Sequence, residues 1–268
     1  MTARRRWLTA AAAAVLAIGS GASAYAGGAL ASGAVVPAVS AQSFTYTTTT
    51  DYWSAVAVQP TLTSDYDVTL QSGGSTLGTS FYGAGKTDFV AVDSNAGTRP
   101  IGATYTAAVS QYTAGSYWIE AQYGASVITL PAITHHGTSG AGDPDIAFIS
   151  LNSNHIVSIA DIYLDAGQSF WALGTNDLNE LFLLEATAGS PSTYVQSRAT
   201  ALSNESTQVI DNCTLYTAKT TGWHALVLVA NTPPTNTNPQ QGIGYALHRY
   251  DPAQPSYCAV ANFPGVTP

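Results

Sequence analysis

Aspartate side chains at the ends of predicted strands are the residues of this chain best suited to hold a cation. Asp65 and Asp67 lie two residues apart, which places both carboxylates on one face of an extended strand. Calcium takes several oxygen ligands, often from loops, so one hypothesis is a calcium site. The alternative is that these side chains bond nearby backbone in turns and at strand ends. The candidate ligands are Asp65, Asp67, Asp88, Asp93, Asp143 and Asp145.

Aromatic side chains form the second candidate site. The chain has 15 Tyr and five Trp, and exposed rings of this kind can stack on sugar rings. The candidate ligand-binding residues are Tyr82, Tyr112, Trp118 and Tyr123. The alternative is core packing: on an extended strand Tyr117 and Ile119 would share one face, with Trp118 and Glu120 on the other.

Catalytic patterns are weak in this sequence. The G-x-S-x-G motif, which holds the nucleophilic serine of many hydrolases, is absent. Ser139 lies in a Gly-rich segment that is typical of a linker. His135 and His136 are adjacent, so on a strand they would face opposite sides, and H-E-x-x-H is also absent. We therefore expect no enzyme and no cofactor apart from the calcium hypothesis, with an unrecognised secreted hydrolase as an alternative.

The two cysteines, Cys213 and Cys258, both lie in the second half of the chain. Outside the cell, an even number of cysteines predicts a disulfide. It would close a loop of about 45 residues and contribute roughly 3–4 kcal/mol by reducing the entropy of the unfolded chain.

The N-terminus has the pattern of a secretory signal peptide. Three arginines at 4–6 precede an apolar run over residues 7–18, and Ala24-Tyr25-Ala26 follows as a cleavage site. Residues 1–26 are therefore predicted to be removed, with Ala22-Ser23-Ala24 as a second possible site. No later stretch reaches the ~18 apolar residues of a spanning helix. We expect a protein that is secreted to the extracellular space and has no membrane span.

Charge excludes some partners. Three of the eight basic residues lie in the predicted signal peptide. The predicted mature chain therefore has five basic and all 16 acidic residues, a net charge of −11. Lys and Arg do not cluster, so nucleic acid and anionic membranes are not expected as partners.

Short alternating apolar segments separated by turn residues predict an all-β fold, with two tandem antiparallel β-sandwiches. The predicted parts are a flexible leader (27–42), a first sandwich (43–131), a linker (132–144) and a second sandwich (145–268). A Gly-aromatic segment closes each half, at 113–120 and at 220–227, about 105 residues apart. Residues 177–188 have a weak helical alternative, but their apolar centre favours a buried strand. The predicted strands are 45–50, 52–58, 66–70, 88–92, 104–109, 116–122, 146–151, 155–164, 168–174, 180–185, 193–200, 213–217, 223–229 and 244–250.

The second half resembles the bacterial pre-peptidase C-terminal domain. The resemblance rests on the turn Asp165-Ala166-Gly167 and on Gly222-Trp223, which matches that family's closing strand. The first half is similar to a divergent copy, through residues 64–70 and 114–118. Residues 179–183 depart from the family's pattern, which has an Asp-led strand there, so the resemblance does not imply a shared ligand site. The resemblance, over about 80% of the predicted mature chain, implies a jelly-roll-like sandwich that accompanies secreted enzymes.

The sequence thus indicates a secreted, non-catalytic binding or adhesion protein. The expected partner is an extracellular glycan, such as a polysaccharide, or a secreted protein. By analogy with the resembled family, the alternative is an accessory or chaperone-like partner of a secreted peptidase.

Overall fold

The computed structural model is built from β-strands. It describes residues 26–29, 41–48, 53–93, 104–123, 127–130, 146–151, 155–174, 179–184, 192–195, 200–201, 212–230 and 243–252. Within these ranges the regular elements are all strands, as the sequence predicted. No helix in the described part is long and apolar enough to cross a membrane.

The first sandwich has two sheets. Its inner sheet has the order β1-β8-β3-β6-β14 and its outer sheet the order β2-β7-β4-β5, with antiparallel pairing throughout. The inner strands are β1 (Ala26–Ala29), β3 (Trp53–Pro60), β6 (Asp88–Asp93), β8 (Tyr117–Tyr123) and β14 (Ser192–Val195). The outer strands are β2 (Ala41–Thr47), β4 (Asp65–Ser72), β5 (Ser75–Ser80) and β7 (Thr104–Thr113).

The second sandwich is built in the same way. Its inner sheet has the order β15-β13-β17-β11-β9, and its outer sheet the order β10-β18-β12-β16. The inner strands are β9 (Val127–Ile128), β11 (Val157–Leu164), β13 (Asn179–Leu184), β15 (Thr200–Ala201) and β17 (Gly222–Ala230). The outer strands are β10 (Ile146–Leu151), β12 (Ser169–Gly174), β16 (Asn212–Thr217) and β18 (Ile243–Arg249).

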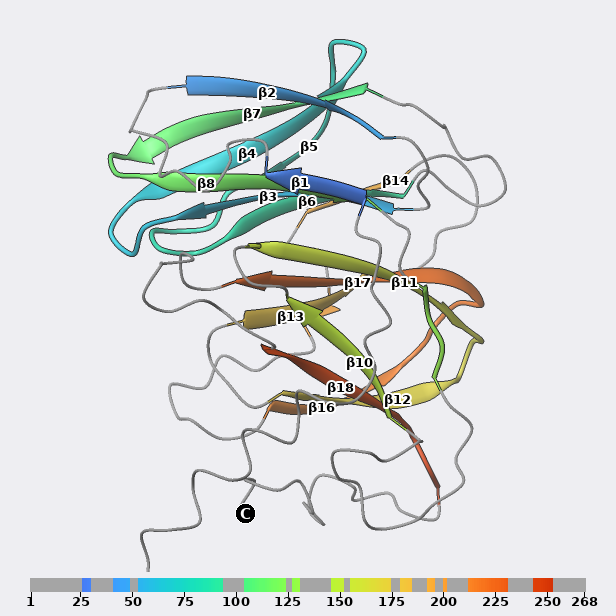
Figure 1. The fold of residues 1–268 in the computed structure, drawn as a ribbon. Coiled ribbons are helices and arrows are strands. Elements are labelled where there is room, and N and C mark those ends of the chain that lie inside the picture. The colour runs from blue at the N-terminus through green and yellow to red at the C-terminus, as the bar shows by residue number, and fades with distance from the viewer. Residues whose placement is uncertain are drawn as a thin grey trace, which may run out of the picture.

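The two sandwiches are stacked, so that the four sheets form successive layers (Figure 1). One apolar core lies between the two sheets of the first sandwich. A second core begins on the other face of the first inner sheet and runs through the second inner sheet to the second outer sheet. Strand β3 is consequently buried along its whole length, and Phe89 contacts Phe182 across the inner sheets with ring centroids 5.1 Å apart. The sandwiches therefore share a continuous apolar contact.

Strand pairing crosses the boundaries expected from the sequence. Strand β14 of the predicted second sandwich pairs with β6 of the first, and β9 of the predicted first sandwich pairs in parallel with β11 of the second. Strand β1, inside the predicted leader except for its first residue, pairs with β8. The whole of the predicted linker lies outside the described residues, as does the predicted signal peptide before Ala26.

The pairing scheme repeats between the sandwiches. The antiparallel pairs β3–β6, β4–β5, β4–β7 and β2–β7 have counterparts in β11–β17, β12–β16, β12–β18 and β10–β18. Strands β3 and β11 both have eight residues and lead through four residues into β4 and β12. The counterpart of β17 is therefore β6. The two Gly-aromatic segments begin β8 and β17, so they do not occupy equivalent positions in the two sandwiches. A glycine before an aromatic residue indicates a turn that leads into a strand, but not which strand of the sheet follows.

Candidate functional site

Three chain connections meet at one end of the first sandwich. They are the turn 61–64 between β3 and β4, the loop 81–87 between β5 and β6, and the turn 114–116 between β7 and β8. The Thr61 N–H donates to the Ser116 carbonyl at 2.9 Å, and the Gly85 N–H donates to the Ser64 carbonyl at 2.9 Å. Backbone hydrogen bonds thus hold the three connections together as one rigid end of the sandwich.

Two glycines permit this close packing. A Cβ on Gly115 would lie 2.3 Å from the Cβ of Ser64. Gly85 has a φ of +75°, and a Cβ there would lie 2.7 Å from the Leu62 carbonyl oxygen. The Tyr66 hydroxyl also donates to the Gly115 carbonyl at 2.9 Å. Side chains at the glycine positions would force the connections apart.

Large apolar side chains are exposed on these connections and beside them. Leu62 is 70% exposed, Phe81 is 72% exposed and Tyr112 is 82% exposed. They are the three most exposed large hydrophobic side chains of the described residues. Leu62 lies in the turn 61–64, Phe81 directly follows β5, and Tyr112 is the penultimate residue of β7. We call these three residues the loop-end surface.

Two of the predicted acidic residues lie beside this surface. Strand β4 alternates, with Tyr66, Val68 and Leu70 in the core and Asp65 and Asp67 on the outer face. Burial raises the pKa of the Asp65 carboxyl. Burial, and then repulsion by Asp65, raises the pKa of Asp67. Repulsion from Asp65 thus adds to burial in opposing the ionisation of Asp67.

Asp88, one of the predicted cation ligands, is hydrogen-bonded inside the first sandwich. It begins β6 and is fully buried. Its Oδ1 accepts hydrogen bonds from the Ser80 hydroxyl at 2.5 Å and from the Tyr82 N–H at 2.8 Å. Burial raises the pKa of Asp88 to about 7. The side chain thus fixes the start of the loop 81–87 from inside the sandwich.

The described residues contain no group of three or more His, Cys, Asp or Glu side chains placed to hold a metal ion. Asp93 ends β6, where it pairs with Trp53 and Ser192, and its side chain lies outside the described part. Asp143 and Asp145 lie outside it entirely. The calcium hypothesis therefore gains no support from Asp65, Asp67 and Asp88.

The four predicted aromatic residues do not form one platform. Tyr112 is on the loop-end surface and Tyr82 is half-buried in the loop 81–87. Trp118 is only 9% exposed and lies in the core that joins the two sandwiches, so its ring is not open for stacking. Tyr123 ends β8, six residues beyond the loop end, and pairs with Ser54.

The predicted disulfide stays a prediction. Cys213 pairs with Leu173 between β16 and β12, but its side chain and the whole of Cys258 lie outside the described residues.

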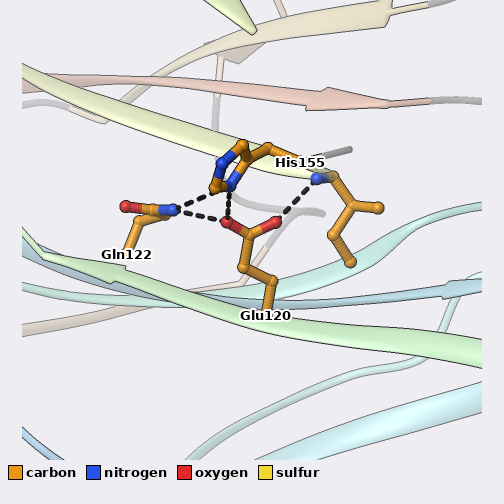
Figure 2. A network of polar contacts seen from close by, with 4 residues as sticks. Glu120, Gln122 and His155 are labelled. Atoms are coloured by element: carbon orange, nitrogen blue, oxygen red, sulfur yellow. Dashed lines mark hydrogen bonds and ion pairs between the residues drawn. The ribbon is translucent and has the colours of Figure 1, made fainter. Parts of the chain in front are cut away.

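A buried polar network joins the sandwiches and is shown in Figure 2. Glu120 of β8 is 2% exposed. Its Oε2 accepts the Ile156 N–H at 2.7 Å, and its Oε1 lies 2.5 Å from Nδ1 of His155. The Gln122 amide donates to the same Oε1. Because His155 and Ile156 immediately precede β11, these bonds connect the two inner sheets.

This network sets the ionisation of His155. The hydrogen bond to Glu120 raises the pKa of His155, burial lowers it by a smaller amount, and the charge of Glu120 adds a further rise. A carboxylate that orients an imidazole is also part of many catalytic sites. Here, however, the same carboxylate bonds the backbone of Ile156, so the contact has a structural role between the sheets.

Comparisons with known proteins identify no family. The sequence matches no family model, and no curated protein matches it. One similar solved structure is the CUB1-EGF-CUB2 domain of human MASP-1/3. It is 9% identical, and the match covers 81% of this chain and 95% of that chain with a TM-score of 0.21. A likeness at this TM-score carries no argument about function.

Sequence reasoning missed Leu62 and Phe81 as surface residues, and Glu120 and His155 as partners. Nothing in the sequence separates an exposed Phe from a buried one at a strand end. One signal was present: Glu120 follows the apolar residues Trp118 and Ile119 and shares a strand face with Trp118, and a buried carboxylate needs a partner.

Proposed function

We propose that this chain is a secreted, non-catalytic binding protein that recognises an extracellular polysaccharide or protein through the loop-end surface. The observation that carries the proposal is the convergence of Leu62, Phe81 and Tyr112, each at least 70% exposed, on one end of the first sandwich. Large exposed apolar side chains that gather in one place commonly mark interaction sites, whereas single ones are normal.

The scaffold beneath these residues supports the proposal. The connections are fixed to one another by the hydrogen bonds of Thr61 and Gly85 and by the close approach of Gly115 to Ser64. A preformed site loses little conformational entropy on binding, which favours affinity. Loops on a rigid β-sandwich are a frequent place for binding residues.

The test compares the chain from residue 27 onward with a triple variant, Leu62→Ser, Phe81→Ser and Tyr112→Ser. Both are immobilised and exposed to the extracellular proteins and to purified wall polysaccharides of the producing cells. The matched control is Val127→Ser with Leu215→Ser, which removes exposed apolar side chains from the second sandwich (54% and 41% exposed).

We expect the triple variant to lose the bound species and the control to retain it. Both variants should keep the unfolding midpoint of the parent, because exposed positions contribute little to stability. Equal capture by the parent and the triple variant would overturn the proposal.

A further inference from the structure

Two carboxylates lie on the strand that separates the two strands carrying the exposed rings of Phe81 and Tyr112. Strand β4 is the central one of three adjacent strands, with β5 on one side and β7 on the other. Asp67 pairs with Ser110, and Asp65 pairs with Thr113, the neighbour of Tyr112. On the other side Val68 pairs with Ser80, the neighbour of Phe81. Since strands are spaced by about 4.8 Å, the backbones that carry the two rings are about 10 Å apart.

The strand pairing is irregular beside the acidic pair. The pairing of β4 with β7 shifts register between Asp65 and Tyr66, so that Tyr112 is the extra residue of a β-bulge opposite this step. Bulges change the direction of a side chain and are frequent next to functional sites. Here the bulge presents the most exposed aromatic ring of the described residues beside an acidic pair.

We propose that this acidic pair and its flanking rings receive a lysine or arginine side chain from a basic segment of another extracellular protein. The inference rests on the proposed binding function and specifies its partner. Carboxylates form charge-assisted hydrogen bonds with ammonium and guanidinium groups. Aromatic faces attract the same cations. The apolar stem of a lysine or arginine can pack on Leu62 and Phe81 while its charged head lies between Asp65 and Asp67.

Charge complementarity favours this occupant over a neutral glycan. The pKa values of Asp65 and Asp67 are raised by burial, and that of Asp67 also by repulsion from Asp65. A bound cation relieves such repulsion, whereas a neutral sugar hydroxyl does not. An exposed leucine such as Leu62 offers a sugar no aromatic face, but suits the apolar part of a protein interface.

The first probe is a fluorescent peptide in which lysine alternates with glycine and serine, and the second is the same peptide with glutamine in place of lysine. Both are titrated against the chain from residue 27 onward. The variants are Asp65→Asn with Asp67→Asn, and Phe81→Ala with Tyr112→Ala. The control is Asp165→Asn, which removes an exposed carboxylate from the second sandwich.

We expect the lysine peptide to bind and the glutamine peptide to bind at least tenfold more weakly. Each double variant should weaken lysine-peptide binding at least tenfold, while Asp165→Asn should change it less than twofold. Added salt should weaken binding to the parent, because the contact is between charges at the protein surface.

Equal binding of the lysine peptide by the parent and by Asp65→Asn with Asp67→Asn would overturn the inference, since attraction would then come from overall charge. Loss of wall-polysaccharide binding in Phe81→Ala with Tyr112→Ala, but not in the aspartate variant, would also overturn it and identify a glycan surface. Either result leaves the proposed binding function intact. That function fails only when the Leu62, Phe81 and Tyr112 triple variant captures the same species as the parent.

Discussion

The Oε1 atom of Glu120 lies 2.5 Å from Nδ1 of His155, so that a buried carboxylate of the first sandwich holds the residue that leads into the second. Glu120 is 2% exposed and lies among the apolar residues that join the inner sheets. A charge in such a place is tolerated only when hydrogen bonds replace its water. Hydrogen bonds with His155, Ile156 and Gln122 take the place of water around this carboxylate.

Glu120→Gln is therefore expected to destabilise the protein. An amide offers one acceptor oxygen where the carboxylate offers two, so either the Ile156 N–H or the Gln122 amide loses its bond. We expect a loss of about 1–3 kcal/mol in the free energy of unfolding, measured by denaturant titration. Asp165→Asn makes the same chemical change at an exposed position and should stay within about 0.5 kcal/mol of the parent. A Glu120→Gln variant as stable as the parent would show that the network does not hold the sheets together.

The same contact predicts a dependence of stability on pH. The folded-state pKa of His155 is raised above 6.5, so the folded state binds the proton more tightly than the unfolded state. The stabilisation is fully present below about pH 6.5 and is lost as the pH rises through the folded-state pKa. In His155→Gln this loss should be absent, and unfolding midpoints measured between pH 6 and 9 should fall less steeply than in the parent. Parallel profiles for the two proteins would contradict the prediction.

The fold was predictable because it depends on local patterns. Strand β4 alternates between core and outer face, and β8 places Tyr117 and Ile119 in one core and Trp118 in the other, as the alternation in the sequence indicated. Residues 179–184 form a strand, β13, as their apolar centre favoured. Strand β5 (Ser75–Ser80) was not predicted, because its Ser, Thr and Gly residues look like an extension of the preceding turn.

The stacking of the sandwiches could not be predicted from local patterns. Runs such as β3 and β11, apolar on both faces, are consistent with sheets covered on both sides. The sequence does not say, however, that the second cover is the other sandwich. The exposed positions of Leu62 and Phe81 depend on how three connections meet, which involves residues up to 55 positions apart. That β6 and β17 occupy equivalent positions likewise follows only from their pairing with β3 and β11.

Asp88 gives a second dependence on pH, in a lower range. Burial raises its pKa from 3.8 to about 7, so the folded state binds more protons than the unfolded state between these values. Stability therefore falls as the pH rises from about 4 to 7. In Asp88→Asn the amide oxygen can still accept the bonds from Ser80 and Tyr82, and no charge has to be buried.

We expect Asp88→Asn to be more stable than the parent at pH 8, by roughly 2–4 kcal/mol, and equal to it within about 1 kcal/mol at pH 4. Chemical denaturation at the two pH values measures this difference. Asp88→Ala is the companion variant: it removes the charge together with both hydrogen bonds and should show no such gain. A parent and Asp88→Asn that respond alike to pH would mean that the carboxyl is not buried as described.

Gly115→Ala should disturb the loop end, and with it the proposed binding surface. The new Cβ would lie 2.3 Å from the Ser64 Cβ and 2.6 Å from its Oγ, so the turns 61–64 and 114–116 must separate. Overpacking of this kind costs about 1–3 kcal/mol, which thermal or denaturant unfolding measures. Gly83→Ala is the matched control, because a Cβ there meets no atom within 4 Å.

Binding by the same two variants separates stability from function. If the loop-end surface is the contact site, Gly115→Ala should weaken capture of the partner under conditions where the protein is still folded. Leu62 lies on one of the two turns that move, and Tyr112 lies two residues before the other. Gly83→Ala should capture the partner as the parent does. Undiminished capture by a folded Gly115→Ala variant with a lowered unfolding midpoint would show that binding takes place elsewhere on the molecule.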